Sequence, residues 1–425
     1  MSASGLKTGQ APVEPTATAG KFKLTWRLLL IGVAALVFLL AVTRSVTDAV
    51  DLTSAGAINA AVALAVPIGL AGLGGLWSER AGVVNIGLEG MMILGTWAGA
   101  WGAIQFDNPW AGVLAGAVGG AVGGLLHAVA TVSFGVDHII SGVAINILGL
   151  GITQFLSKVT FADMPGGGDT QSPPVPKPGV VSLPWVGEAL ADLEARHWFL
   201  ISDLAGILRG LTTNVSLFTI LAILLIPLTF YVLWRTAFGL RLRSCGERPV
   251  AAESLGVNVY TYKYVAVVIS GALAGLGGAF LSLVASSAYR EGQTGGRGFI
   301  GLAAMIFGNW RPGGLAGGAL LFGYTDALQL RRGGESVHAL LLLVAILLAA
   351  VAVHQLVRQN RSRAAVLTGV SALAVLVAFA LTDSIPPQFT SVTPHITTLL
   401  VLSLAAQRLR MPAADGLPYR KGQAK

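Results

Sequence analysis

Apolar runs of about 20 residues recur along nearly the whole chain, and they constrain its fold more than any other sequence feature. A helix of that length crosses about 30 Å of hydrocarbon. Of the 425 residues, 54% are hydrophobic and only 11% are charged, whereas about a quarter of an ordinary soluble domain is charged. Since lipid offers the backbone no hydrogen-bond partners, we predict an all-α, polytopic bundle of membrane-spanning helices.

These runs define twelve expected spans, and the charges between them indicate their orientation. If the N-terminus lies in the cytoplasm, most Lys and Arg residues fall in cytoplasmic connections, as the positive-inside rule requires. No small-residue cleavage site follows the first run, so we expect an uncleaved span, and both termini are predicted to be cytoplasmic. The expected spans are 26–43, 56–76, 83–104, 111–134, 139–157, 215–235, 264–286, 298–309, 313–330, 337–356, 365–382 and 394–408.

Two short sequences occur twice, once in each half of the chain. The sequence LAGLGG occupies 70–75 and 273–278, and IGLEGM at 86–91 is similar to IGLAAM at 300–305. In the expected topology the two copies cross the membrane in opposite directions, which is the pattern of an inverted-topology repeat with a site near the midplane. The alternative is a chance similarity between helices rich in Gly, Ala and Leu.

The segment 78–92, SERAGVVNIGLEGMM, places an amide and a carboxylate one helical turn apart in an apolar region. A carboxylate within the bilayer is costly unless it is paired or faces water, so Glu89 is expected to point into the bundle or a cavity. We therefore predict that Asn85 and Glu89 line the substrate pathway. Alternatively, Asn85 caps a helix that begins at Ile86, and Glu89 binds the backbone of a neighbouring helix.

Three more residues are assigned to this pathway. Asp326, in FGYTDALQL, is a second intramembrane acid, for which a structural hydrogen bond is the alternative role. Met92 and Phe299 complete the predicted lining.

Two charged residues, Glu79 and Arg80, fall at the cytoplasmic end of a span, where we expect water to solvate them.

The sequence lacks the motifs of common enzyme classes. No G-x-x-x-x-G-K-[ST], G-x-S-x-G or H-E-x-x-H motif occurs, so we predict no cofactor, and any ATP used for transport must bind another subunit. The six His residues lack metal-ligand spacing, and no metal site is predicted. The single cysteine, Cys245, excludes an internal disulfide and is interpreted as an incidental loop residue. The net charge of +8 is attributed to loop bias and not to nucleic-acid binding, since no basic patch contains interleaved aromatic residues.

Four blocks of the sequence together resemble one family of transport proteins. They are SERAGVVNIGLEGMM, CGERPVAAESLGVNVYTYKYVAVVISGALAGLGGAF from Cys245, EGQTGGRGFIGLAAMIFGNWRPGG from Glu291, and LPYRKG from Leu417. In this order they resemble the permease subunits of bacterial ABC importers for simple sugars and nucleosides. The match is closest to the nucleoside branch, which is served by Bmp-type lipoprotein receptors.

The resemblance implies a nonenzymatic translocation subunit in the bacterial cytoplasmic membrane. It also implies three partners: a second related permease in a heterodimer, a cytoplasmic ATPase with tandem nucleotide-binding domains, and an extracytoplasmic substrate-binding lipoprotein. Simple sugars such as ribose are the alternative substrate class. An ion-coupled secondary transporter is the other alternative, because inverted repeats and Glu89 would also suit one.

The largest cytoplasmic connection between spans, 236–263, separates these alternatives, since a secondary transporter has no ATPase to engage. Helix formers follow Pro249 and Gly256 supplies a stop, so the connection is predicted to contain a short helix. The resemblance identifies it as the coupling helix that docks on the ATPase. In that family the sequence Glu-Ala-Ala is followed by three residues and then by Gly, and Ala251, Ala252 and Gly256 fit this spacing. The predicted coupling residues are Gly246, Glu247, Pro249, Ala251, Ala252, Glu253, Gly256 and Asn258.

The chain departs from the family pattern at three places. Val250 stands where the family has Glu, which makes Glu247 or Glu253 the expected charged contact. The outer loop 158–214 is longer than the family's, and 336–383 is interpreted as an inserted two-span hairpin beside a ten-span core. The predicted organisation is a disordered cytoplasmic tail (1–25), a permease core (26–335), the transmembrane hairpin (336–383), and a last span with a cytoplasmic tail (384–425).

Overall fold

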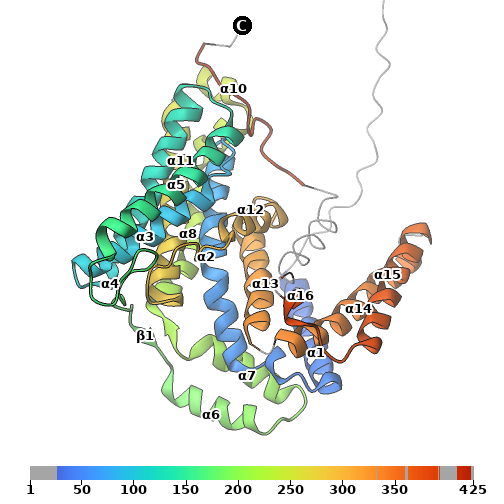
Figure 1. Ribbon diagram of the computed structural model, residues 1–425. Helices are drawn as coiled ribbons and strands as arrows, with labels where there is room; N and C mark the ends of the chain where they lie inside the picture. Colours follow the sequence, from blue (N-terminus) through green and yellow to red (C-terminus); the bar gives the residue numbers. More distant parts are fainter. Residues whose placement is uncertain (1–25, 332, 359–361, 391, 393–408, 423–425) are drawn as a thin grey trace, which may run out of the picture.

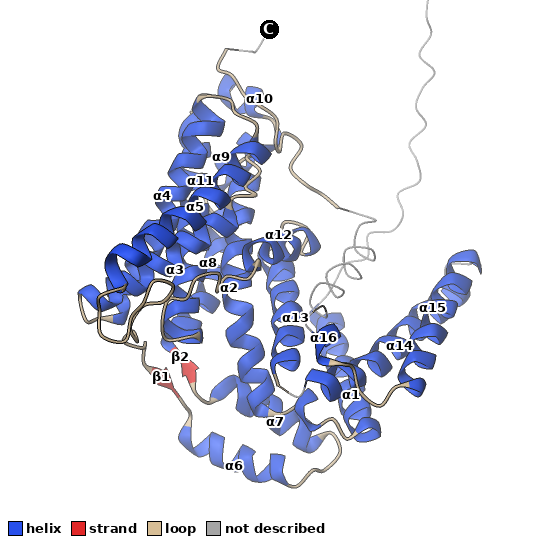
Figure 2. Ribbon diagram, viewed as in Figure 1, coloured by secondary structure: helices blue, strands red, loops and turns tan. Residues whose placement is uncertain are grey.

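The structure, a computed structural model, is almost entirely helical, which confirms the predicted all-α class (Figure 2). Eight of its described helices are long and apolar enough to cross a membrane. Each of the first eleven expected spans coincides with a helix, whereas the expected tail 1–25 and last span 394–408 lie outside the described part of the chain. The structure describes residues 26–331, 333–358, 362–390, 392 and 409–422.

The elements are helices joined by turns and a few longer loops, with one pair of two-residue strands in the described part of the chain. In chain order they are α1 (Trp26–Thr47), η1 (Val50–Leu52), α2 (Ala55–Arg80), α3 (Leu88–Gln105), α4 (Pro109–Ala128), η2 (Val129–Ser133), α5 (His138–Phe161), β1 (Val180–Val181), α6 (Pro184–Ala195), α7 (Ile201–Thr212), β2 (Val215–Ser216), α8 (Leu217–Arg235), α9 (Ala237–Glu247), α10 (Pro249–Ser254), α11 (Val259–Phe280), η3 (Leu281–Ala285), α12 (Arg297–Phe307), α13 (Pro312–Leu330), α14 (Gly333–Arg358), α15 (Ser362–Leu381) and α16 (Pro387–Thr390).

Two helices, α2 and α11, pack against each other at the centre of the bundle (Figure 1). On its other sides α2 packs against α12 and α13, and α11 packs against α3 and α4. The helices that follow α2 in the chain thus surround α11, and those that follow α11 surround α2. This exchange of neighbours is the internal correspondence that the repeated sequences predict.

Glycines allow the helices around α11 to approach very closely. A Cβ atom on Gly275 would lie 2.2 Å from the carbonyl oxygen of Gly116, and one on Gly120 would lie 2.2 Å from that of Gly271. Small residues at such crossings let backbones meet where lipid provides no hydrophobic drive for helix association. The packing of α4 on α11 therefore depends on these four glycines.

The two ends of the bundle differ in structure. At one end, called the α6 end, the long connection 158–214 forms α6 and α7, which cover the start of α2 (Figure 1). Arg44 and Asp203 form an ion pair there, with 2.8 Å between their nitrogen and oxygen atoms. Glu194 of α6 accepts a hydrogen bond from the backbone N–H of Ala55. The opposite end, called the α10 end, carries the short helices α9 and α10.

A helical hairpin, α14 and α15, lies to one side of the bundle (Figure 1). The two helices pack on each other, and α14 also touches α1 and α13. Much of α15 is exposed, as expected of an apolar helix that meets lipid on most sides. The hairpin makes no contribution to the central α2–α11 packing.

Candidate functional site

The helix predicted to begin near residue 83 begins only at Leu88, because 81–87 is non-helical. Two histidines from neighbouring helices hold this break by its backbone. His127 donates from Nε2 to the carbonyl oxygen of Val84 (3.0 Å), and Nδ1 of His138 accepts from the N–H of the same residue (3.2 Å). Irregular backbone at membrane depth is stable where protein supplies the missing partners, as it does here.

Asn85 lies within this break and is fully buried. Its amide nitrogen donates to the hydroxyl of Ser270 in α11 (2.9 Å), and its oxygen accepts from the N–H of Gly87 (3.1 Å). It therefore closes a turn that leads into α3 and ties that turn to the central helix. Its predicted place in the pathway stays a prediction.

Glu89 lies in the first turn of α3 and binds the first residues of α12. Its two carboxylate oxygens accept hydrogen bonds from the N–H groups of Gly296 (2.9 Å) and Gly298 (2.7 Å). This is the contact with a neighbouring backbone that formed the alternative interpretation of the sequence. One carboxylate thus lies at the N-termini of two helices, where the helix dipoles favour negative charge.

Asp326 pairs with a cation that the sequence analysis did not select. The guanidinium of Arg297, the first residue of α12, lies 2.7 Å from Oδ2 of Asp326 in α13. Arg297 also donates to the carbonyl oxygens of Gln293 and Thr294. The sequence did contain a signal for Arg297, since this arginine follows two glycines and begins an apolar run.

These contacts form a connected set, which we call the central network: Asn85, Glu89, Asn146, Ser270, Arg297 and Asp326. Asn146 accepts from the N–H of Gly90 (2.7 Å) and lies eight residues beyond the start of α5, about 12 Å along that helix. The network joins α3 of one half of the chain to α12 of the other.

The two remaining predicted pathway residues have different surroundings. Met92 is fully buried and packs with Ala71 and Leu281. Phe299, two residues into α12, exposes 46% of its surface. The structure therefore does not bring these two side chains together in one described cavity.

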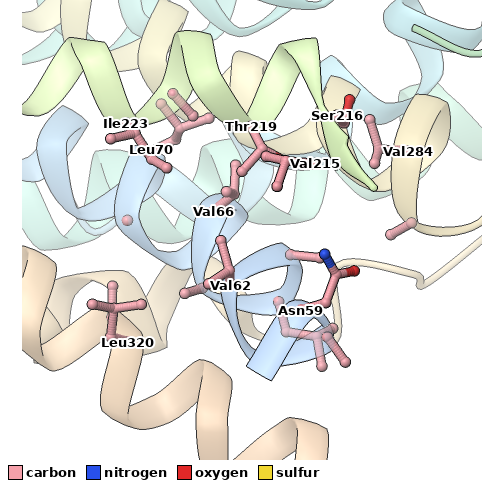
Figure 3. A pocket seen from close by; sticks show the side chains of 18 of the residues that line it. Asn59, Val62, Val66, Leu70, Val215, Ser216, Thr219, Ile223, Val284 and Leu320 are labelled. Carbon is pink, nitrogen blue, oxygen red and sulfur yellow. The ribbon is translucent and has the colours of Figure 1, made fainter. Parts of the chain in front are cut away.

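A cavity of about 710 Å³ lies between α2, α8 and α13, and none of the five predicted pathway residues lines it (Figure 3). Aliphatic side chains such as Val62, Val66 and Ile223 form most of its wall. Asn59 is one of its few polar groups, and the carbonyl oxygens of Gly210 and Thr213 already bind its amide. The cavity is suited to apolar matter more than to a polar solute.

The predicted coupling residues gather at the α10 end. The predicted short helix is α10, with Pro249 at its first position, and Gly256 after it has φ of +81°. A left-handed residue just beyond a helix end is the usual place for glycine. Ala251 is exposed, Ala252 is buried, and Asn258 caps α11 through the N–H of Thr261.

The remaining coupling residues contact the core and the end of the chain. Gly246 lies against the end of α2, where a Cβ would approach the carbonyl oxygen of Arg80 to 2.3 Å. Glu247 and Glu253 accept hydrogen bonds from backbone N–H groups of the segment 409–422. Both acids are therefore engaged within the chain.

The expectation that water solvates Glu79 and Arg80 is wrong. Glu79 is 6% exposed and accepts from the indole N–H of Trp310 (2.5 Å). Arg80 donates to the carbonyl oxygen of the same residue (2.7 Å from Nη2). The turn between α12 and α13 covers both side chains, which sequence position alone did not indicate.

Cys245 is buried in α9, and burial raises the pKa of its thiol to about 11. Little thiolate forms at neutral pH, so the thiol is a poor nucleophile. Within the described residues, no group of three His, Cys, Asp or Glu side chains could hold a metal ion. The candidate site thus consists of hydrogen-bonding groups and charges.

A bundle of membrane-spanning helices with two internally related halves, helix starts in its interior and a buried polar network is typical of a transporter-type membrane protein. The chain belongs to the family described as branched-chain amino acid transport system / permease component, whose model matches residues 57–351.

Three relatives match nearly their full lengths, each at 33% identity. The guanosine ABC transporter permease protein NupQ of Bacillus subtilis aligns over 86% of this chain and 97% of its own. The nucleoside ABC transporter permease protein NupC of Lactococcus lactis aligns over 84% and 94%. The putative glucose ABC transporter permease protein TsgC13 of Haloferax volcanii aligns over 85% and 96%. No solved structure matches the chain.

Proposed function

We propose that this permease is the translocation subunit of an ATP-driven importer for nucleosides. The observation that carries the proposal is the full-length similarity to two permeases named for guanosine and nucleoside transport. The chain itself performs no catalysis in this proposal, and ATP binds a partner subunit.

The partners in this proposal are a second permease, an ATPase with tandem nucleotide-binding domains and an extracytoplasmic substrate-binding lipoprotein. Bacillus subtilis and Lactococcus lactis each have a second matching permease, NupP and NupB, at 24% and 22% identity. Such pairs favour a heterodimer of two related permeases. The ATPase would dock at the α10 end, and the lipoprotein at the α6 end.

In this proposal the protein lies in the bacterial cytoplasmic membrane, with the α10 end and both termini in the cytoplasm. The core is 26–335, and the hairpin α14–α15 (within 336–383) is an addition at its lipid-facing side. The separation of the hairpin from the α2–α11 centre supports this assignment (Figure 1).

Reconstituted transport tests the function. The permease, co-purified with its partners and placed in proteoliposomes, is expected to take up guanosine or another nucleoside when ATP is supplied on the side of the α10 end. A non-hydrolysable ATP analogue should abolish that uptake. Uptake driven by a proton or sodium gradient without ATP would contradict the proposal and favour the secondary transporter.

Simple sugars are the second candidate substrate, because the glucose-named relative is as similar as the nucleoside permeases. The same proteoliposomes measured with ribose and glucose separate the two classes. ATP-dependent sugar uptake with no nucleoside uptake would replace the nucleoside assignment and leave the ABC mechanism in place.

Gly256 provides a test of the coupling role of α10. No atom lies within 4 Å of a Cβ built at Gly256, so Gly256→Val adds no clash, but its φ of +81° disfavours the new residue by about 1–2 kcal/mol. We expect assembly to persist and uptake per ATP hydrolysed to fall about tenfold. Gly256→Asn is the matched control, since Asn tolerates this conformation. Equal uptake per ATP hydrolysed in the two variants would contradict the prediction.

A further inference from the structure

The last described segment of the chain, 409–422, contains no helix or strand, yet it lies along the α10 end (Figure 1). We call it the strap. The sequence predicted only a cytoplasmic tail here. Its contacts connect elements that are distant in the chain, so it is part of the folded structure.

The first half of the strap binds the core. The N–H of Arg410 donates to the side-chain oxygen of Asn309, in the turn between α12 and α13 (2.8 Å). The N–H of Ala414 donates to the carbonyl oxygen of Gly246 at the end of α9 (2.8 Å). Since Gly246 itself lies against the end of α2, the strap fastens α9 to the central helix.

A buried side chain anchors the strap at its middle. Asp415 is 8% exposed, and its carboxyl group lies close enough to that of Glu79 in α2 for each to affect the pKa of the other. Burial raises the pKa of Asp415 to about 7, while the nearby charges of Lys263 and Arg80 oppose that rise. The raised pKa favours the uncharged form of this carboxyl group, which lowers the repulsion between Asp415 and Glu79.

Backbone N–H groups of the strap also bind both acidic coupling residues. The N–H of Ala413 donates to Glu247 (3.3 Å), and the N–H of Gly422 donates to Glu253 of α10 (3.3 Å). Between them, Tyr419 packs on the apolar cluster shared by α9, α10 and α11. The position of α10 relative to the bundle therefore depends on the strap.

The strap and α10 expose apolar and basic side chains outside the membrane-spanning helices. Leu255, directly after α10, is 86% exposed, and Leu417 of the strap is 58% exposed. Arg248, Arg420 and Lys421 are exposed too, and none forms an ion pair within the described part of the chain. Exposed leucines beside unpaired cations on the aqueous side indicate a protein partner with an apolar patch and an acidic rim.

We infer that the strap and α10 together form the surface on which the partner ATPase docks. The strap holds α10 in place and contributes Leu417, Arg420 and Lys421 to the contact. The occupant follows from the position of this surface, which continues directly from α10. This inference rests on the proposed function, because it takes the ATPase as the partner.

Association of the purified, full-length permease with its co-purifying ATPase is the test. Leu417→Glu places a charge in the apolar contact, and the double variant Arg420→Glu/Lys421→Glu reverses the electrostatic match. Each is expected to weaken association about tenfold, because central interface residues dominate binding. Both changes lie at exposed positions, so membrane insertion and thermal stability should match those of the wild type.

Matched controls carry the same chemical changes at the α6 end. Trp185→Glu alters a side chain that is 88% exposed, and Lys177→Glu reverses an exposed cation. Neither should change ATPase binding. Removal of 409–425 should weaken binding at least as much as the point variants, since it also releases α10.

Three results would overturn the inference. If the wild-type chain recruits an ATPase and both strap variants retain its affinity, the strap is not part of the docking surface, although the proposed function stands. If truncation alone weakens binding, the strap only positions α10. A wild-type chain that recruits no ATPase would overturn the proposed function and this inference together.

Discussion

Replacing Gly275 with alanine should lower the free energy of unfolding by about 3 kcal/mol, at the upper end of the cost of overpacking. The new Cβ would lie 2.2 Å from the carbonyl oxygen of Gly116 and 2.8 Å from the Cα of Gly120. Both obstacles are backbone atoms, so relief requires α4 and α11 to separate. Because α11 is the centre of the bundle, that shift also disturbs its contacts with α2 and α3.

Thermal stability of the purified protein in detergent measures this effect. Gly151→Ala in α5 is the matched control, because no atom lies within 4 Å of its Cβ position. There alanine should be neutral or stabilise the helix by up to about 1 kcal/mol. Equal melting temperatures for the Gly275 and Gly151 variants would show that the α4–α11 crossing is looser than the structure indicates.

The spans could be predicted from the sequence because hydropathy is a local property. An apolar run such as 215–235 needs a helix to satisfy its backbone in lipid, whatever its neighbours are. The interruption at 81–87 was missed because its residues are as apolar as the helices around it. What keeps it non-helical is a set of distant donors and acceptors, among them His127 and His138.

The candidate site could be predicted only in part, because a residue type is visible in the sequence whereas its distant partners are not. Glu89 and Asp326 are visible in the sequence as acids within apolar segments, which marks them as paired or functional. The partners of Glu89, Gly296 and Gly298, come from the other half of the chain, and the partner of Asp326, Arg297, comes from the preceding helix, 29 residues earlier. Sequence spacing carries no information on such contacts, so the sequence indicated the two acids but not the residues that bind them.

The burial of Glu79 shows the same limit at the α10 end. Position in the chain placed it at a membrane edge, where a charged side chain is usually solvated. In the structure Trp310 and the strap cover it from two segments that lie far away in the sequence. Tertiary contacts thus bury Glu79, which the sequence placed at the surface, and make it part of the contact that anchors the strap.

Glu89→Leu should impair both stability and uptake, because it removes the carboxylate that joins the starts of α3 and α12. It leaves the N–H groups of Gly296 and Gly298 without acceptors, at a cost of about 1–3 kcal/mol each. Glu89→Gln keeps one acceptor oxygen, so stability and uptake should both fall less than in Glu89→Leu. Glu188→Leu, at an exposed acid of α6, is the control and should behave as the wild type.

The comparison of melting temperature with transport rate separates the two roles considered for Glu89. If it joins the two halves of the chain, the two quantities should fall together in the order wild type, Gln, Leu. If it binds the solute in the pathway, uptake should fall in both variants while the melting temperature of Glu89→Gln stays at the wild-type value. Wild-type melting and wild-type uptake for Glu89→Leu would contradict both roles, since two buried donors cannot lose their acceptor without consequence.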